Sequence, residues 1–379
     1  MALSPNYSWA EPDNSSLVKN GAQDIRALGD AIDTSVWNVG FGQAGKNKII
    51  NGDFGINQRN FTSIATTNTY GYDRFFIVLA DGTVTWTPQV FALGAAPVAG
   101  YESTNFSRIV TTGQTAVSAI ARLDQRIENV RTFAGQTVTV SFWAKAATGT
   151  PSIAPEFQQV FGSGGSPSAT VNGIIAGTPK QAITTSWARY SFTIAVPSIS
   201  GKTIGTNNDS SLTLGLYVSA GSNFNARTGS LGIQSNTFDI WGVQVEYGSK
   251  ATPFQTATGT IQGELAACQR YLPAWTGTSN QTLGVAANTN NTRVTVPFMV
   301  TPRVAPTGLT YSNLTHFAIN NPSLSSGDPT SITFVFAGTS SAVIGVDVGL
   351  NAPVIATGTT VQFSADSSSA LLLFTGCEL

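Results

Sequence analysis

The stretch VTVSFWAKA at residues 138–146 carries the strongest fold signal in this sequence. Every second residue is apolar, so one face of an extended chain would present Val138, Val140, Phe142 and Ala144. Such alternation is typical of a half-buried antiparallel strand rather than of a helix. The side chains between them, that of Trp143 included, would then point to the opposite face.

Two further stretches extend this pattern. WARYSFTIAV at 187–196 alternates in the same way, and FDIWGVQVEYG at 238–248 is apolar on both faces, which suits a central strand. Breaks rich in Gly, Ser and Pro separate such runs, notably at 161–168 and 200–211. Many short strands with breaks of this kind indicate a sandwich or jelly roll. We therefore predict a jelly-roll/β-sandwich domain over residues 47–258.

A short helix signal follows this predicted domain. In TIQGELAACQRY at 260–271, Ile261, Leu265 and Cys268 can share one side, and Pro273 would stop the helix. The segment 259–274 is therefore expected to be a linker helix between two β-domains.

The C-terminal third returns to strand patterns, so we predict a β-sandwich tip domain over residues 275–379. Strands are expected at 293–300, 331–336, 342–348, 359–364 and 370–375. ITFVF at 332–336 and LLLF at 371–374 are very apolar, and on an exposed edge they would invite aggregation. We expect both segments to lie centrally or between subunits. The chain as a whole is predicted to be mainly β.

The N-terminal region differs, because NSSLVKNGAQDIRALGDAIDTSVW at 14–37 is patterned as a helix. Val18, Ile25 and Ile32 recur every seven residues, and Leu28 lies on the same stripe. A helix this short is marginal alone in water, so its stripe needs a partner. Another copy of the chain is the partner that we expect. Residues 1–46 are accordingly predicted to be an arm with an oligomerisation helix.

Composition narrows the function. Charged residues make up 10% of the 379, against about 25% in an ordinary soluble domain, and the net charge is −1. No basic field is present that could hold a nucleic acid. The sequence contains no apolar run of about 18 residues, so no membrane span is predicted. The first residues lack the pattern of a secretory signal, so we expect synthesis in the cytoplasm. The two cysteines, Cys268 and Cys377, are expected to be buried free thiols, with a bridge between them as the alternative.

Nothing in the sequence demands catalysis. His316 is the single histidine and no G-x-S-x-G motif occurs. Four acidic residues are scattered in or beside the predicted strands, namely Asp53, Asp73, Asp239 and Glu246. They could be ion-paired with Arg59 or Arg74, could hold a structural calcium, or could be catalytic. We expect no catalytic residue, no metal site and no cofactor.

Several segments, taken in order, resemble phage tail-fibre and minor tail proteins. They are residues 33–59, 70–76 (YGYDRFF), 141–146 (SFWAKA), 238–254, 264–271 (ELAACQRY) and 295–307 (TVPFMVTPRVAPT). The resemblance implies an N-terminal virion anchor that is usually trimeric, a jelly roll similar to carbohydrate-binding modules, and a receptor-binding tip.

The resulting hypothesis is a virion protein of the tail, assembled in the cytoplasm of a bacterial host. It would form a homo-oligomer, most simply a trimer, through Val18, Ile25, Leu28 and Ile32. Its N-terminus would contact other tail proteins, and its outer parts would bind a host surface glycan or protein. Candidate receptor contacts are Tyr311, His316 and Phe317 in a tip loop, and Trp143 on the sandwich. An internal or collar-type structural protein and a glycan depolymerase are the alternatives.

Overall fold

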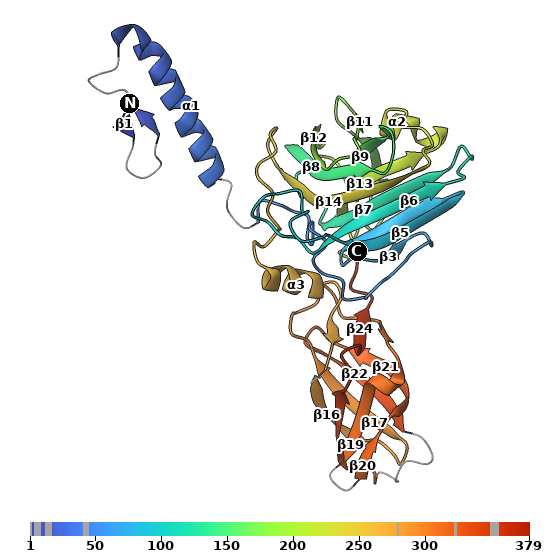
Figure 1. Cartoon of the computed structure of the whole chain (residues 1–379). Helices are drawn as coiled ribbons and strands as arrows, with labels where there is room; N and C mark the ends of the chain where they lie inside the picture. Colours follow the sequence, from blue (N-terminus) through green and yellow to red (C-terminus); the bar gives the residue numbers. More distant parts are fainter. Residues whose placement is uncertain are drawn as a thin grey trace.

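The computed structural model describes residues 2–3, 9–11, 17–40, 45–278, 280–321, 324–348 and 356–379. It has an N-terminal helical arm, a large β-sandwich and a smaller β-domain beneath the sandwich (Figure 1). The chain is mainly β, as the alternating patterns predicted. No helix in the described ranges is long and apolar enough to cross a membrane.

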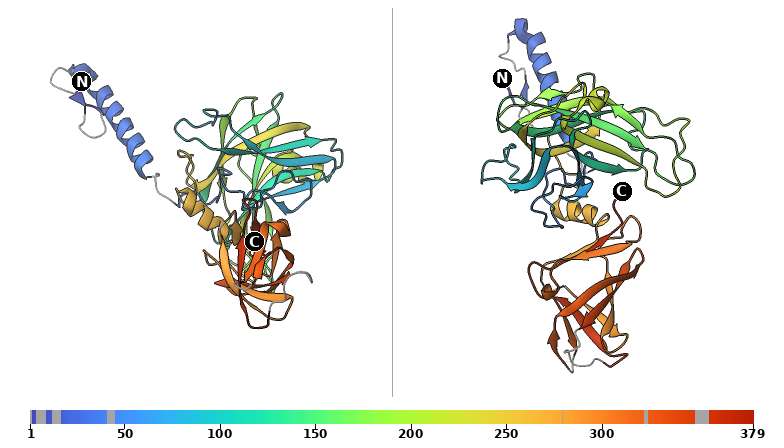
Figure 2. Two further views of the ribbon diagram at one scale, coloured as in Figure 1. Left: turned by 60° about the horizontal axis from the view of Figure 1, so that its bottom comes forward. Right: turned by 90° about the vertical axis from the view of Figure 1, so that its right-hand side faces the viewer.

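The arm stands away from the sandwich in Figure 1 and in the left view of Figure 2. Strand β1 (Ala2–Leu3) pairs with β2 (Ala10–Glu11), and the 3₁₀ turn η1 (Val18–Asn20) leads into α1 (Gly21–Gly40). Along α1, Ile25 is 65% exposed and Ile32 37%, while Leu28 is half-buried. The side chain of Val18 lies outside the described residues. A single chain therefore leaves Ile25 and Ile32 exposed to water.

Two sheets form the sandwich. The order in the first is β12 (Ala188–Ala195), β8 (Thr137–Ala146), β14 (Asn236–Tyr247), β6 (Asn105–Thr112) and β5 (Thr83–Val90). The second runs β10 (Val171–Ile174), β9 (Ser152–Val160), β13 (Ser211–Ala220), β7 (Ile120–Glu128), β4 (Phe75–Ala80) and β3 (Thr69–Tyr70). Strand β11 (Gln181–Ala182) also pairs with β9.

The four apolar residues of the alternating pattern in β8 face the core as predicted, but the strand is not half-buried, because Thr139, Ser141 and Trp143 on its other face are buried as well. Val138, Val140, Phe142 and Ala144 are fully buried in the core between the sheets. In the neighbouring strand, Tyr190 lies opposite Phe142 and also faces the core. Strand β14 is central and buried along almost its whole length, as its two apolar faces predicted.

The outer face of the second sheet carries a buried ionic group beneath η2 (Ser222–Phe224) and α2 (Asn225–Thr228). Arg122 makes a bidentate pair with Asp124 at 2.6 Å, and Arg227 binds Glu156 at 2.7 and 2.8 Å. Gly215 lies between the two carboxylates, where a Cβ would come within 2.6 Å of the Arg122 side chain. Because the charges of this group are paired with one another, it does not offer a free site.

The predicted linker helix is α3 (Ile261–Gln269), and it packs firmly on the sandwich. The hydroxyl of Thr260 caps it by accepting from Gly263 N at 3.1 Å. Glu264, only 1% exposed, accepts from Asn51 N at 2.6 Å, and Cys268 is fully buried. Helix α3 is thus held to the sandwich and is no free spacer. Both cysteines are buried free thiols, and the alternative of a bridge between them is wrong.

The C-terminal domain is a second sandwich. Its three-stranded sheet runs β15 (Ala274–Thr276), β24 (Leu371–Thr375), β18 (Gly308–Tyr311). The larger sheet runs β20 (Leu324–Gly327), β19 (Phe317–Asn321), β23 (Thr360–Ala365), β16 (Gln281–Ala286), β17 (Asn291–Pro297), β22 (Ser341–Val348), β21 (Pro329–Ala337). The 3₁₀ turn η3 (Leu314–His316) precedes β19.

The two very apolar segments of this domain have different positions. LLLF lies in β24, the central strand of the smaller sheet, as expected. ITFVF lies in β21, which is an edge strand of the larger sheet in the part of the chain that the structure describes, so its central placement was wrong. Phe336 at its end is 60% exposed. A β-bulge between Phe334 and Phe336 breaks the alternation there, and bulges are a common way to blunt a sheet edge.

Residues 376–379, which we call the latch, join the C-terminal domain to the sandwich. Glu378 sits between Arg59 and Arg74, at 2.7 Å from a guanidinium nitrogen of each. Arg74 is only 1% exposed, and its guanidinium also lies 3.4 Å from the ring centroid of Tyr271. Arg303 adds hydrogen bonds to the main chain of Asn208 and of Cys377. The latch therefore buries a charged contact between the two domains.

Asp73, beside the latch, should make stability depend on pH. Burial raises its pKa to about 6, although Arg59 and the hydrogen bonds from Gln58 oppose the shift. The unfolded chain loses this proton near pH 4 and the folded chain only near pH 6. The free energy of unfolding should therefore fall by about 3 kcal/mol between these values. Urea unfolding across this pH range, compared with Asp73→Asn, checks the prediction, because the variant should lack this share of the slope. Equal slopes would contradict it.

Candidate functional site

An aromatic cluster covers the outer face of the first sheet of the sandwich. Trp241 is fully buried there, with ring centroids 4.8 Å from Phe254, 5.4 Å from Trp143 and 5.6 Å from Tyr101. Trp241 lies opposite Trp143 and points outward by the regular alternation of β14, and the register with β8 shifts only after it, between Trp241 and Gln244, which marks a bulge. Gly242 makes the bulge possible, because its φ is +66° and a Cβ would lie 2.8 Å from Trp143.

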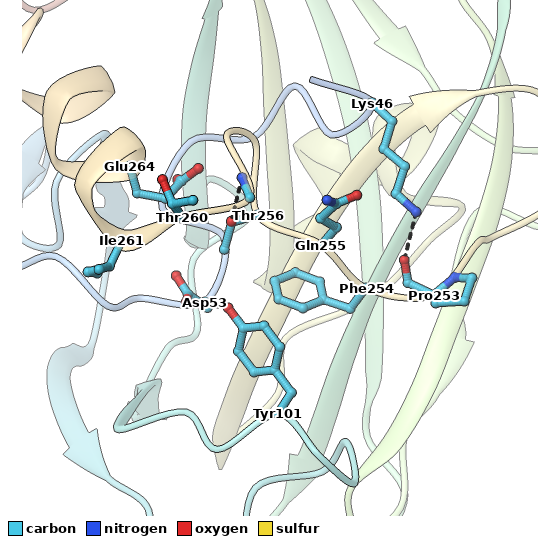
Figure 3. Close-up of a pocket in the computed structure, with 11 residues that line it drawn as sticks. Lys46, Asp53, Tyr101, Pro253, Phe254, Gln255, Thr256, Thr260, Ile261 and Glu264 are labelled. Carbon is cyan, nitrogen blue, oxygen red and sulfur yellow. Dashed lines mark hydrogen bonds between the residues drawn. The ribbon is translucent and has the colours of Figure 1, made fainter. Parts of the chain in front are cut away.

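Where this cluster reaches the surface near α3, the chain forms a pocket of about 350 Å³ (Figure 3). Its volume falls within the range of about 300–1,000 Å³ that is usual for small-molecule sites. Tyr101 and Phe254, with ring centroids 5.4 Å apart, give the pocket an aromatic wall, and Ile261, in the first turn of α3, also lines it. The remaining lining is mostly polar and comprises Lys46, Asp53, Pro253, Gln255, Thr256, Gly259, Thr260 and Glu264.

The polar groups of the pocket are fixed by hydrogen bonds. The phenol of Tyr101 donates to Asp53 Oδ2 at 2.8 Å. Burial, reinforced by the charge of Asp53, raises the pKa of Tyr101, so the phenol keeps its proton. Lys46 Nζ donates to Thr252 Oγ1 at 2.5 Å and to Pro253 O at 2.9 Å. Burial lowers the pKa of Lys46, and the charge of Glu246 opposes that effect.

A second cavity of about 360 Å³ lies between α3 and the sandwich. Its charged groups are already engaged: Glu128 accepts from Arg270 at 2.7 Å, and Arg74 is paired with Glu378. Lys48 donates to Gly45 O at 2.7 Å. The charged groups named here are engaged with other parts of the chain, so this cavity is a weaker candidate for a ligand site than the first pocket.

Two of the four predicted receptor contacts, Trp143 and Phe317, are buried in the structure. Trp143 does lie on the outer face of β8, but it is only 9% exposed beneath Phe254 and Arg189, so little of its ring can meet a ligand. Phe317 is fully buried and stacks on Phe363 at 5.4 Å. Its expected role as a receptor contact is wrong in this conformation, because the first residue of β19 points into the core.

The other two tip residues remain at the surface. Tyr311 is 38% exposed, and His316 is half-buried with Nδ1 2.9 Å from Ser312 Oγ. Both belong to the C-terminal domain, whereas the pocket is built by the sandwich and α3. Tyr101 and Phe254 were not predicted from the sequence. Phe254 ends one of the segments that resemble phage tail proteins, but no local pattern marks it, or the loop that contains Tyr101, as part of a site.

The four acidic residues noted in or beside the predicted sandwich strands have three different environments. Asp239 pairs with Arg108 at 2.7 Å, and Asp73 lies 3.9 Å from Arg59. Glu246 accepts from Thr252, and Asp53 lines the pocket. Among the residues that the structure describes, no group of three or more His, Cys, Asp or Glu side chains could hold a metal ion.

No protein-family model matches the chain, and no curated protein matches it either. Solved structures with a similar arrangement include a putative sugar-binding protein from Bacteroides thetaiotaomicron, with 13% identity and a TM-score of 0.31 over 53% of this chain and all of that one. The family 11 carbohydrate-binding module from Clostridium thermocellum has 9% identity and a TM-score of 0.28, over 50% and 98% of the two chains. A Stig cyclase from Fischerella has 12% identity and a TM-score of 0.31, over 55% and 100%.

The chain is a β-sandwich protein.

Proposed function

We propose that this protein is an oligomeric phage virion protein, a tail fibre-type adhesin, whose sandwich pocket binds a glycan of the host surface. The observation that carries the glycan part is the pairing of an aromatic wall with polar groups at both ends of one pocket. A sugar ring offers an apolar face to an aromatic side chain and hydroxyl groups at its rim. Tyr101 and Phe254 supply the wall, Asp53 accepts hydroxyl donors, and Lys46 donates.

The virion part rests on two supports. The first is the ordered resemblance of the segments to phage tail-fibre and minor tail proteins. The second is helix α1, whose residues Ile25 and Ile32 are exposed in a single chain. Several copies joined at α1 would present several pockets, which would raise the avidity for a repetitive surface glycan. Tyr311 and His316 are a second proposed contact, on the tip.

Binding to a panel of neutral oligosaccharides and to host surface polysaccharide tests this function. Tyr101→Ala should weaken binding at least tenfold, because it removes one aromatic wall, and a tenfold loss corresponds to about 1.4 kcal/mol. Tyr311→Ala tests the second proposed contact, on the tip. Tyr247→Ala is the matched control, because it removes the same side chain from an exposed position outside both proposed contacts. A melting temperature close to that of the unmodified protein would show that each variant folds.

Each other outcome is informative. If only Tyr311→Ala loses binding, the receptor site is on the tip and the pocket proposal fails. If the assembled protein binds no host glycan, an internal or collar-type role replaces the adhesin. Release of reducing ends from the polysaccharide would instead indicate a depolymerase.

A further inference from the structure

We infer that the sandwich pocket selects neutral sugars and rejects acidic ones, such as uronic acids. This inference rests on the proposed glycan binding and names the class of glycan. Asp53 and Glu264 carry two negative charges in the lining, against the single positive charge of Lys46.

Glu264 supplies a negative charge that cannot turn away from the pocket. Its Oε2 accepts from Asn51 N at 2.6 Å, and its Oε1 accepts from Thr258 N at 2.7 Å and Thr258 Oγ1 at 2.8 Å. The side chain is held in one position by these bonds, and the residue is 1% exposed. Glu264 also lies in the first turn of α3. It already provides the negative charge that a helix N-terminus favours, which leaves less attraction for an acidic ligand.

Asp53 supplies the second negative charge, and it still has acceptor capacity. Its Oδ2 accepts the phenol proton of Tyr101, and its Oδ1 accepts a long bond of 3.3 Å from Gly55 N. A carboxylate offers about four acceptor positions, so about two are open. Ligand hydroxyls can donate to these positions. A ligand carboxylate has no proton to donate and would meet a like charge.

Lys46 does not cancel this asymmetry. Its ammonium is at the far side of Phe254 and Gln255 from Asp53 and Glu264, as Figure 3 shows. Two of its three donors are used on Thr252 and Pro253. One donor is left for a ring oxygen or a hydroxyl of the ligand. The pocket thus presents acceptors at its acidic end and a single donor at the other.

Matched pairs of oligosaccharides test the inference. The full-length protein would be titrated calorimetrically with a glucose-containing and a glucuronate-containing oligosaccharide of the same linkage, and with a galactose and galacturonate pair. We expect the neutral member of a pair to bind at least tenfold more tightly. Asp53→Asn should reduce this ratio to about threefold or less, because the amide keeps an acceptor oxygen and removes the charge.

Asp328→Asn is the control, since it makes the same chemical change at an exposed site on the C-terminal domain. It should leave the ratio unchanged. Equal or tighter binding of the uronate by the unmodified protein would overturn the inference while the glycan-binding function stands. So would a ratio that Asp53→Asn does not move. Binding of neither member of any pair would instead remove the proposed function itself.

Discussion

Glu378→Gln should lower the free energy of unfolding by about 3 kcal/mol, because it leaves a buried guanidinium without its counter-charge. Arg74 is 1% exposed, and Glu378 is its only acidic partner among the described residues. The neutral glutamine keeps the size of the side chain and one acceptor oxygen, so the change isolates the charge. Urea unfolding monitored by fluorescence measures the effect.

A double-mutant cycle separates this coupling from general damage. Arg74→Met alone should also be costly, because it leaves Glu378 with Arg59 as its one remaining cation and removes the contact with Tyr271. The double variant should be less destabilised than the sum of the two, since both members of the pair are then neutral. Glu102→Gln, at an exposed site of the sandwich, should change stability by less than about 0.5 kcal/mol. A loss of that small size for Glu378→Gln would show that the latch is dispensable.

The latch also shows why part of the fold could not be predicted from the sequence. The alternation in VTVSFWAKA specified which face of β8 lies against the other sheet, because the period of a strand is a local property. It did not show that the outer face is covered too, because that cover comes from distant segments of the chain. The pairing of Arg59 and Arg74 with Glu378 joins positions more than 300 residues apart. Nothing in a local pattern indicates such a contact. For the same reason, the sequence suggested a spacer where α3 is in fact packed on the sandwich.

The candidate site was beyond prediction for a related reason. Asp53, Tyr101 and Phe254 come from three separate loops, and only the folded sheets bring them together. Phe317 was predicted to be a receptor contact because polar residues surround it in the sequence, but it is the first residue of a strand and points into the core. In α1 the sequence did indicate which apolar side chains share one face, because the positions of that stripe follow from the helical period alone.

Ile25→Asp combined with Ile32→Asp should convert the assembled protein to a monomer. Full burial of an isoleucine side chain contributes about 1.5–3 kcal/mol relative to exposure. Each copy of the chain would lose two such contributions, and two carboxylates would enter the seam of the assembly. Sedimentation at micromolar concentration measures the mass before and after the change. The unmodified chain should sediment as an oligomer, with a trimer as the proposed state.

Ala27→Asp is the matched control for this prediction. Ala27 is exposed and lies on the side of α1 opposite the stripe, so the same charge should leave the assembly intact. The doubly substituted monomer should keep its sandwich pocket and bind a soluble oligosaccharide as before, yet lose avidity for a polysaccharide surface. If the unmodified protein is itself a stable monomer at micromolar concentration, the exposed stripe of α1 has another partner and the trimeric fibre proposal fails. Retained assembly in the doubly substituted protein would instead place the contact between copies outside α1.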